Sequence, residues 1–262
     1  MMITSIHNPK IQKVRALLNR RQDREEARAF VAEGVRLVEE AAAANWQVQQ
    51  VLFCPEQLSL RGQQLVERCR QLGAEVEPVA PHIMQAATGT ETPQGVLAVL
   101  ELTPLPLPDR LNFVLVLDEV RDPGNLGTLL RSAAAAGVQA VLLTPGTTDA
   151  FSPKVVRSGM GAHFRLPIRA STWDEIRRVC HLQTPPLHLY LAEAEQGDSC
   201  WSLDMRQPLA LLIGGEAEGA SEAARSVADS NILIPMPGCS ESLNAAVAGS
   251  ILMFEVVRQR SA

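Results

Sequence analysis

Cysteines are few in this 262-residue sequence, and the five that occur stand at positions 54, 69, 180, 200 and 239. None of them belongs to a Cys-x-x-Cys pair, which argues against a zinc site and against a disulfide framework. Long apolar runs are also missing, because no stretch reaches the length of a membrane span. The opening residues lead to His7, Lys10 and Lys13 rather than to an apolar segment, which argues against a signal peptide. We therefore expect a reduced, cytoplasmic protein with no metal and no membrane partner.

Lysine is scarce as well, since 21 of the 24 cationic side chains are arginine, and the formal net charge is −5. This balance argues against strong non-specific nucleic-acid binding at physiological salt. The charge is uneven, however: residues 1–36 carry eight basic and four acidic side chains, whereas residues 37–108 carry three basic and eight acidic ones. Arginine is well suited to forked phosphate contacts. The basic segment is therefore either an RNA-facing surface or a solvated helix face in an arginine-rich chain.

The first hundred residues alternate between helical and extended patterns, which predicts a small α/β domain. We expect helices over 9–20, 35–44 and 58–72, and strands over 30–32, 48–54, 76–79 and 95–102. Prolines 104, 106 and 108 then enforce extended backbone, which is typical of a linker. The expected domains are residues 1–104 and 111–262, joined by a proline-rich linker over 105–110.

The second domain opens with an unbroken apolar run over 113–117, which is typical of a strand buried on both faces. Further strands are expected over 140–144, 188–192, 209–213 and 231–234, and helices over 126–136, 154–161, 173–180 and 243–258. This pattern predicts an α/β fold, a parallel sheet covered by helices on both faces.

Three polar segments interrupt these elements. The first, Asp122-Pro-Gly-Asn125-Leu-Gly127 followed by Arg131, lies at the start of a helix, where free N–H groups favour an anion. Taken alone, Asn125 could equally be a helix N-cap and Arg131 a surface cation.

The other two segments come late in the chain. Ile213-Gly214-Gly215-Glu216 ends a strand, and ligands of parallel sheets bind at the carboxyl ends of strands. Ile234-Pro-Met236-Pro-Gly238 breaks any regular element and leads through Ser242 and Asn244 into an alanine-rich helix. The alternatives are an acidic residue at a helix start for Glu216 and a plain N-cap for Ser242.

Together, in this order and at these separations, the three segments resemble the motifs of the SpoU/TrmH family of RNA ribose methyltransferases in the SPOUT superfamily. The resemblance covers nearly all of residues 112–260. In addition, Ile6-x-Asn8-Pro9-Lys10 and Phe30-Val-Ala-Glu-Gly34-x-Arg36 resemble the L30e-like substrate-binding domain of many rRNA-modifying members. The departures are modest, and Cys239 and Glu241 occupy variable positions.

The resemblance implies a deep trefoil knot, a homodimer formed through the C-terminal domain, and S-adenosylmethionine bound largely by backbone. It assigns the cofactor to Gly214, Ile234 and Leu243, with Gly215, Met236 and Ser242 beside them. It makes Arg131 the central catalytic residue, with Asn125, Glu216 and Asn244 positioning it and the ribose. Since free arginine hardly ever deprotonates, we expect Arg131 to hold the target phosphate and stabilise the alkoxide.

The expected function is thus S-adenosylmethionine-dependent 2′-O-methylation of RNA, with 23S-type rRNA as the substrate. Lys10, Lys13, Arg20, Arg21 and Arg36 are the expected RNA-binding side chains. The alternatives are a tRNA or base methyltransferase of the same superfamily and a catalytically silent RNA-binding or ribosome-assembly protein.

Overall fold

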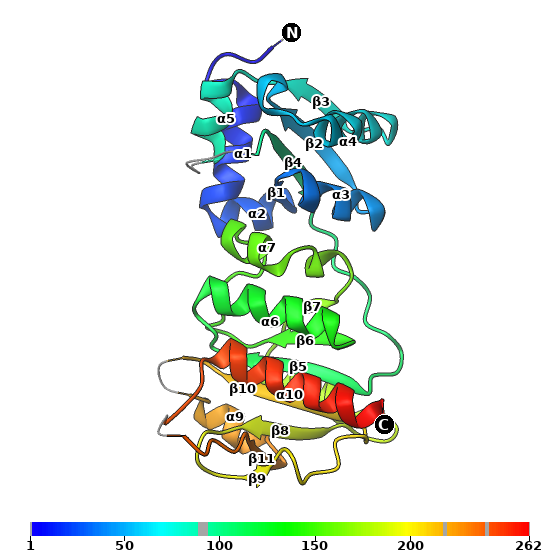
Figure 1. Ribbon diagram of the computed structural model, residues 1–262, viewed down its shortest axis with the longest axis vertical. Helices are drawn as coiled ribbons and strands as arrows, with labels where there is room; N and C mark the ends of the chain where they lie inside the picture. Colours follow the sequence, from blue (N-terminus) through cyan, green and yellow to red (C-terminus); the bar gives the residue numbers. More distant parts are fainter. Residues whose placement is uncertain (1, 89–93, 217–218, 239–240, 262) are drawn as a thin grey trace. The chain divides into compact units, whose positions relative to one another are not determined.

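A computed structural model describes residues 2–88, 94–216, 219–238 and 241–261 of the chain. The chain divides into two compact units (Figure 1). The first unit comprises Met1–Thr103 and Phe151–Phe164, and the second comprises Pro104–Ala150 and Arg165–Ala262. No helix in the described part of the chain is long and apolar enough to span a membrane.

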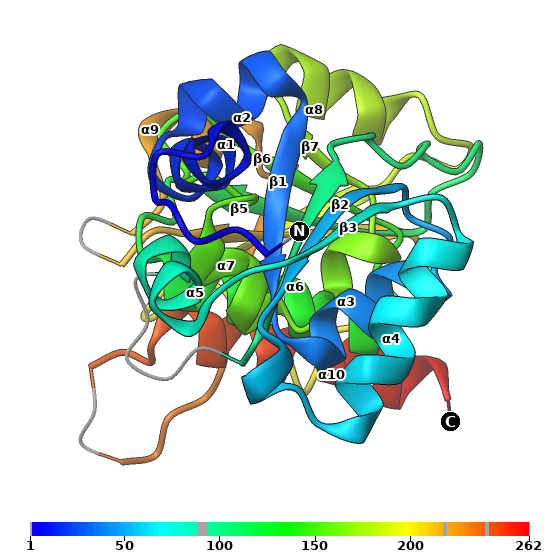
Figure 2. The same cartoon turned by 90° about the horizontal axis from the view of Figure 1, so that it is seen from above.

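The first unit is built on a four-stranded mixed sheet with the order β1-β4-β2-β3. Its strands are β1 (Ala29–Glu33), β2 (Val48–Phe53), β3 (Glu75–Pro78) and β4 (Val96–Glu101). Successive apolar side chains of β1 and β4 point to opposite faces of the sheet, and both faces are buried. One face packs on α1 (Pro9–Asn19) and α5 (Pro81–Thr88), and the other on α3 (Val35–Ala43) and α4 (Leu60–Gln71) (Figure 2). The short helix α2 (Arg21–Ala27) follows α1.

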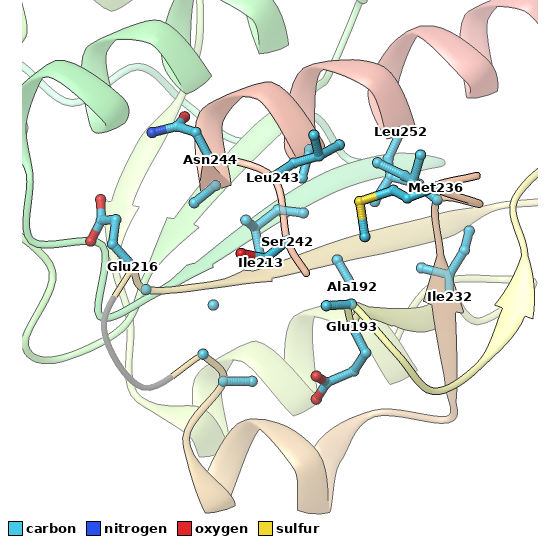
Figure 3. Close-up of a pocket in the computed structure, with 18 residues that line it drawn as sticks. Ala192, Glu193, Ile213, Glu216, Ile232, Met236, Ser242, Leu243, Asn244 and Leu252 are labelled. Atoms are coloured by element: carbon cyan, nitrogen blue, oxygen red, sulfur yellow. The ribbon is translucent and has the colours of Figure 1, made fainter. Parts of the chain in front are cut away.

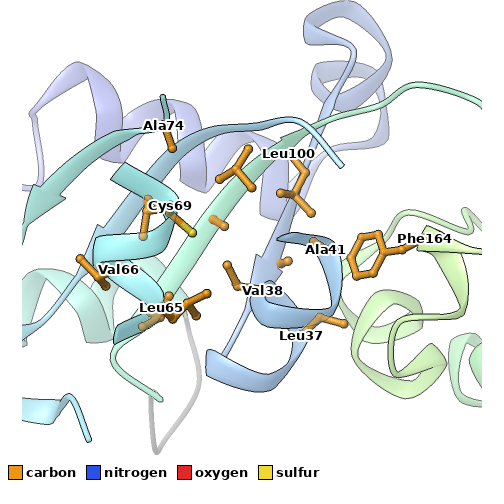
Figure 4. Close-up of a cluster of buried hydrophobic side chains, with 14 of the residues drawn as sticks. Leu37, Val38, Ala41, Leu65, Val66, Cys69, Ala74, Leu100 and Phe164 are labelled. Carbon is orange, nitrogen blue, oxygen red and sulfur yellow. The ribbon is translucent and has the colours of Figure 1, made fainter. Parts of the chain in front are cut away.

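A segment from the middle of the chain completes this first core. Helix α7 (Pro153–Gly159) and the 3-10 turn η2 (Ala162–Phe164) bring Phe151 and Phe164 to Phe30, with ring centroids 5.0 and 6.4 Å away. Figure 4 shows Phe164 together with buried side chains of α3 and α4. Arg157 adds an ion pair to Glu33 at 3.0 Å. The sequence placed this segment in the C-terminal domain by its position in the chain, but its apolar contacts make it part of the first unit.

The second unit holds a seven-stranded sheet with the order β7-β6-β5-β10-β8-β11-β9, in which every pair of neighbours is parallel. Its strands are β5 (Phe113–Asp118), β6 (Ala140–Leu143), β7 (Ile168–Ala170), β8 (His188–Ala192), β9 (Asp198–Ser199), β10 (Leu209–Gly214) and β11 (Ser230–Leu233). Helices α8 (Trp173–His181) and α9 (Glu222–Val227) cover one face. Helices α6 (Pro123–Ala135) and α10 (Ala245–Arg260) pack together on the other face. The expected α/β fold with a parallel sheet is confirmed.

The elements that the sequence did not predict are short. They are the helices α2, α5 and α9, and the strands β7 and β9, the last of which has two residues. Short elements complete few periods of a hydrophobic pattern, so that their positions depend more on tertiary packing than those of long elements do.

The cysteines of the described residues are buried free thiols, Cys54, Cys69, Cys180 and Cys200. Burial raises the pKa of Cys180 to about 12 and that of Cys200 to about 11. Because the thiolate is the reactive form, we expect neither to be alkylated by iodoacetamide at pH 8 in the folded protein. Mass spectrometry should find both modified only after unfolding in guanidinium. Labelling of either residue in the folded protein at the rate of free N-acetylcysteine would contradict this expectation.

Candidate functional site

The three polar segments meet at the carboxyl edge of the parallel sheet. Strands β5 and β10 are neighbours, and Asp118 at the end of β5 lies in register with Gly214 at the end of β10. The first segment follows β5, the second follows β10, and the third follows β11. Parallel strands bring their carboxyl ends to one edge, which is where ligands of such sheets bind.

Hydrogen bonds join one side chain from each segment. The Asn125 Nδ2 amide donates to Glu216 Oε1 at 2.8 Å, and Asn244 Nδ2 donates to Asn125 Oδ1 at 3.0 Å. The other oxygen of Glu216 accepts the backbone N–H of Arg121 at 3.2 Å. Asn125 is therefore the centre of a polar triad, Glu216–Asn125–Asn244, assembled from residues about 90 and 120 positions apart in the sequence.

Helix caps hold this polar triad in place. Asp122, rather than Asn125, caps α6 by accepting the Asn125 N–H at 2.8 Å. Asn244, rather than Ser242, caps α10, since its Oδ1 accepts the N–H groups of Ala246 and Val247. The plain N-cap interpretations of Asn125 and Ser242 are therefore wrong. With its oxygen committed to the helix, Asn244 can only present its amide hydrogens to Asn125.

Arg131 stands apart from the triad. It is exposed on α6, six residues after Asn125, and thus about 9 Å further along the helix axis. It forms no hydrogen bond or ion pair with any residue that the structure describes. Its neighbour Ser132 accepts a hydrogen bond from Ser250 of α10 at 2.8 Å, so Arg131 lies on the helix that packs against α10. The structure thus joins three of the four predicted catalytic residues and leaves the arginine free to meet a ligand or a second chain.

A pocket of about 560 Å³ opens beside the triad. Glu216 and Asn244 lie at one end of it, and Met236, Leu252 and Ile232 lie toward the other (Figure 3). All six residues that the sequence assigned to the cofactor are on its wall, namely Gly214, Gly215, Ile234, Met236, Ser242 and Leu243. Ala217, Glu218 and Cys239 lie outside the described residues.

Glycine is required at two positions of the pocket wall. A Cβ on Gly214 would lie 2.5 Å from the Ala220 nitrogen, and a Cβ on Gly215 would lie 2.5 Å from the Glu119 carbonyl oxygen. These positions therefore offer bare backbone to a ligand. The only charged side chains among the described residues of the wall are Glu193 and Glu216. Bare backbone, apolar side chains and two carboxylates fit a nucleoside that carries positive charge, as S-adenosylmethionine does.

The sequence did not identify the part of the wall at the end of β8, which consists of Ala192, the last residue of the strand, and of Glu193 and Ala194 after it. Glu193 forms an ion pair with Arg225 of α9, and its carboxylate points toward that helix (Figure 3). The signal was available, because these residues stand at the carboxyl end of a predicted parallel strand. Among the described residues, no group of three or more His, Cys, Asp or Glu side chains could hold a metal ion.

A buried carboxylate links two segments of the site. Asp118 is 1% exposed and accepts hydrogen bonds from the Thr144 hydroxyl at 2.9 Å and from the Ser221 N–H at 2.8 Å. Ser221 caps α9, and the two residues before it, Gly219 and Ala220, line the pocket. Asp118 therefore ties the end of β5 to the segment that forms the glycine-lined wall.

The predicted RNA-binding side chains of the first unit differ in their contacts. Lys10 is held by Glu75 at 2.6 Å and by Glu77, and Arg21 pairs with Glu25. Lys13, Arg20 and Arg36 are exposed and have no carboxylate partner among the described residues. Of the eight basic side chains in residues 1–36, Arg24 is buried and donates to the Leu17 carbonyl. Part of the basic segment is thus structural, and its role in RNA binding stays a prediction.

Two family models match the chain. The model of the SpoU rRNA Methylase family matches residues 112–254, more than half of the sequence. The model of the MRM3-like substrate binding domain matches residues 8–98. The two matches correspond to the two resemblances found in the sequence.

Relatives match over nearly the whole chain. The 23S rRNA (guanosine(2553)-2′-O)-methyltransferase RlmP of Bacillus subtilis is 33% identical over 96% of this chain and 98% of its own. The 23S rRNA (uridine(2479)-2′-O)-methyltransferase of Streptomyces viridochromogenes is 35% identical over 98% of this chain and 92% of its own.

Solved structures match equally well. The SpoU methyltransferase AviRb from Streptomyces viridochromogenes, in complex with S-adenosylmethionine, superposes with a TM-score of 0.89 at 32% identity, over 98% of this chain and 99% of its own. An S-adenosylmethionine-bound rRNA methyltransferase from Sinorhizobium meliloti superposes with a TM-score of 0.86 at 31% identity, over 98% of this chain and 97% of its own.

Proposed function

The chain belongs to the SpoU rRNA methylase family, and we propose that it transfers a methyl group from S-adenosylmethionine to the 2′-hydroxyl of a ribose in 23S-type rRNA. The relatives that match it along its length are 23S rRNA 2′-O-methyltransferases, and similar structures contain the methyl donor. The observation that carries the proposal is the polar triad at the mouth of a glycine-lined pocket.

Different residues of the site would bind the methyl donor, the ribose and the phosphate. Gly214, Gly215 and Leu243 would hold S-adenosylmethionine, which supplies an activated methyl group when bound. The triad stands at one end of the pocket and presents a carboxylate and two amides, groups that can orient a ribose hydroxyl. Arg131 would bind the target phosphate and stabilise negative charge that develops on the ribose oxygen.

The RNA itself is recognised, in this proposal, through the first unit, whose residues match a substrate-binding domain. Lys13, Arg20 and Arg36 are among its exposed cations that have no carboxylate partner in the described part of the chain. With a net charge of −5 the protein must rely on such local cations and on RNA shape. The free thiols of the described cysteines support the cytoplasmic location expected from the sequence.

We also propose that the second unit is knotted, as the resemblance implies. Close approach of chain segments supports this proposal: a Cβ on Gly249 of α10 would lie 2.5 Å from Leu129 Cδ2 of α6. Segments that end the chain and segments near the start of the unit thus pack with almost no space between them.

An apolar stripe on α10 supports the homodimer. Val247 and Phe254 are 47% and 48% exposed and lie seven residues apart, which places them on one face of the helix. We expect Phe254→Glu to weaken dimerisation at least about 30-fold, because it places a charge in an apolar interface. Sedimentation velocity over a concentration series measures this change. Trp201→Glu, at an exposed aromatic residue outside α10, is the matched control. A wild-type protein that sediments as a monomer at all concentrations would exclude the dimer.

The function is tested by methyl transfer in vitro. Purified protein is incubated with labelled S-adenosylmethionine and with rRNA or tRNA from a strain that lacks the gene. Resistance of one phosphodiester to alkaline hydrolysis identifies a 2′-O-methylated ribose. We expect label in 23S-type rRNA at a single such position. Label in tRNA or on a base would replace the proposed substrate, and cofactor binding with no transfer to any RNA would favour the silent RNA-binding protein.

A further inference from the structure

Arg121 stands at the mouth of the site and was given no role by the sequence. Its backbone N–H donates to Glu216 Oε2 at 3.2 Å, so its main chain lies directly beside the polar triad. Its side chain is 63% exposed and pairs with Glu119, two residues earlier in the chain. This partner is itself 37% exposed, and exposed ion pairs of this kind contribute little to stability. The guanidinium is therefore held loosely and can exchange its partner.

Without the Arg121 guanidinium, the charges around this position would repel RNA. Three carboxylates lie close to Arg121: Glu119 and Glu216 contact it directly, and Asp122 follows it in the chain. None of the described residues that line the pocket is a lysine or an arginine. A polyanion that approaches the triad therefore meets net negative charge unless a nearby cation offsets it.

The chemistry of the substrate calls for a cation at this distance. A ribose 2′-oxygen and the 3′-phosphate of the same nucleotide are attached to neighbouring carbons. When the 2′-hydroxyl is placed against the triad, that phosphate must lie within a few ångströms of it. Arg131 lies about 9 Å along α6 from Asn125, whereas the Arg121 backbone contacts Glu216 itself. A guanidinium can bind a phosphate through two parallel N–H donors, as it binds a carboxylate.

We propose that Arg121 is a substrate-binding residue: its guanidinium leaves Glu119 and binds the 3′-phosphate of the nucleotide to be methylated. Glu119 then acts as a stand-in for that phosphate in the absence of RNA. This inference rests on the proposed RNA substrate. It adds a second cation beside the one assigned to the target phosphate: Arg121 acts in substrate binding alone, whereas Arg131 also stabilises the reacting oxygen.

The test is the kinetics of Arg121→Ala in the full-length protein with the rRNA substrate. Loss of a charge-assisted phosphate contact should raise KM for RNA about tenfold. The salt dependence of RNA binding, plotted as log Kd against log salt concentration, should lose about one unit of slope. The kcat and the Kd for S-adenosylmethionine should stay unchanged. Glu119→Gln, which removes the competing carboxylate and keeps the size, should instead lower KM for RNA.

Arg206→Ala is the matched control. Arg206 also pairs with a carboxylate two residues before it, Asp204, and its side chain is 66% exposed. It precedes β10 and thus lies at the amino edge of the sheet, away from the site. An Arg121→Ala variant with the KM and salt slope of wild type, or of Arg206→Ala, would overturn the inference. Wild-type protein that methylates no RNA would instead overturn the proposed function, so the two failures are distinguishable.

Discussion

Replacement of Arg131 by alanine should lower kcat for RNA methylation by about 10² to 10³-fold, the usual effect of removing one group that stabilises charge in a transition state. Arg131 is exposed, and its loss removes no hydrogen bond or ion pair among the residues that the structure describes. The free energy of unfolding and the Kd for S-adenosylmethionine should therefore stay near the wild-type values. Initial rates with saturating cofactor and rRNA, together with calorimetric binding of the cofactor, measure both quantities.

The control for this variant is Arg177→Ala. Arg177 is an exposed arginine of α8, on the helix layer that covers the opposite face of the same sheet. Its removal changes the net charge by the same amount and should leave kcat unaltered. Arg131→Lys separates charge from shape, because lysine keeps the charge and loses the planar fork. Equal rates for wild type and Arg131→Ala would remove Arg131 from the mechanism.

Gly214→Ala should weaken cofactor binding at least about tenfold and lower kcat/KM about 100-fold, since a displacement of about 1 Å in a positioned site has an effect of this size. The added Cβ would lie 2.5 Å from the Ala220 nitrogen and 2.6 Å from the Gly219 carbonyl carbon. Both atoms are backbone, so no rotamer change can relieve the contact, and the pocket wall must move. Isothermal titration with S-adenosylmethionine measures the Kd directly.

Gly238→Ala is the matched control for this prediction. Gly238 belongs to the third polar segment, yet a Cβ there would meet nothing within 4 Å. We expect its Kd to equal that of wild type. Thermal unfolding of Gly214→Ala separates a local change from loss of the fold, because overpacking destabilises by about 1–3 kcal/mol. Wild-type affinity in a folded Gly214→Ala protein would show that the wall does not bind the cofactor.

The second unit was well predicted because its pattern is strong. Strands buried on both faces read as continuous apolar runs, and β5 and β10 are of this kind. The family was identified from the joint order of three motifs, and that resemblance is confirmed. The roles of single residues were less certain. The sequence allowed Asn125 to be a helix cap, whereas in the structure its side chain lies between Glu216 and Asn244.

Contacts between distant segments could not be predicted in this way. Nothing in the sequence around Phe151 and Phe164 indicates that these rings pack on Phe30. Nor does the sequence indicate that Arg157 pairs with Glu33. For the same reason Lys10 was expected to face RNA, whereas two glutamates of β3 hold its ammonium group. Periodicity reports which face of an element is apolar but not which segment covers it.

The sequence by itself determined the α/β class, the parallel sheet, the family, and six of the residues that line the pocket. It could do so because local apolar runs indicate which strands are buried, and because the glycines of the pocket belong to motifs of fixed spacing. Only the tertiary structure decided that Asn125 joins Glu216 to Asn244, that residues 151–164 complete the first core, and that Arg121 stands beside the triad. The physical reason is that hydrogen bonds and ion pairs depend on distances of a few ångströms, which arise only after the strands have aligned their carboxyl ends.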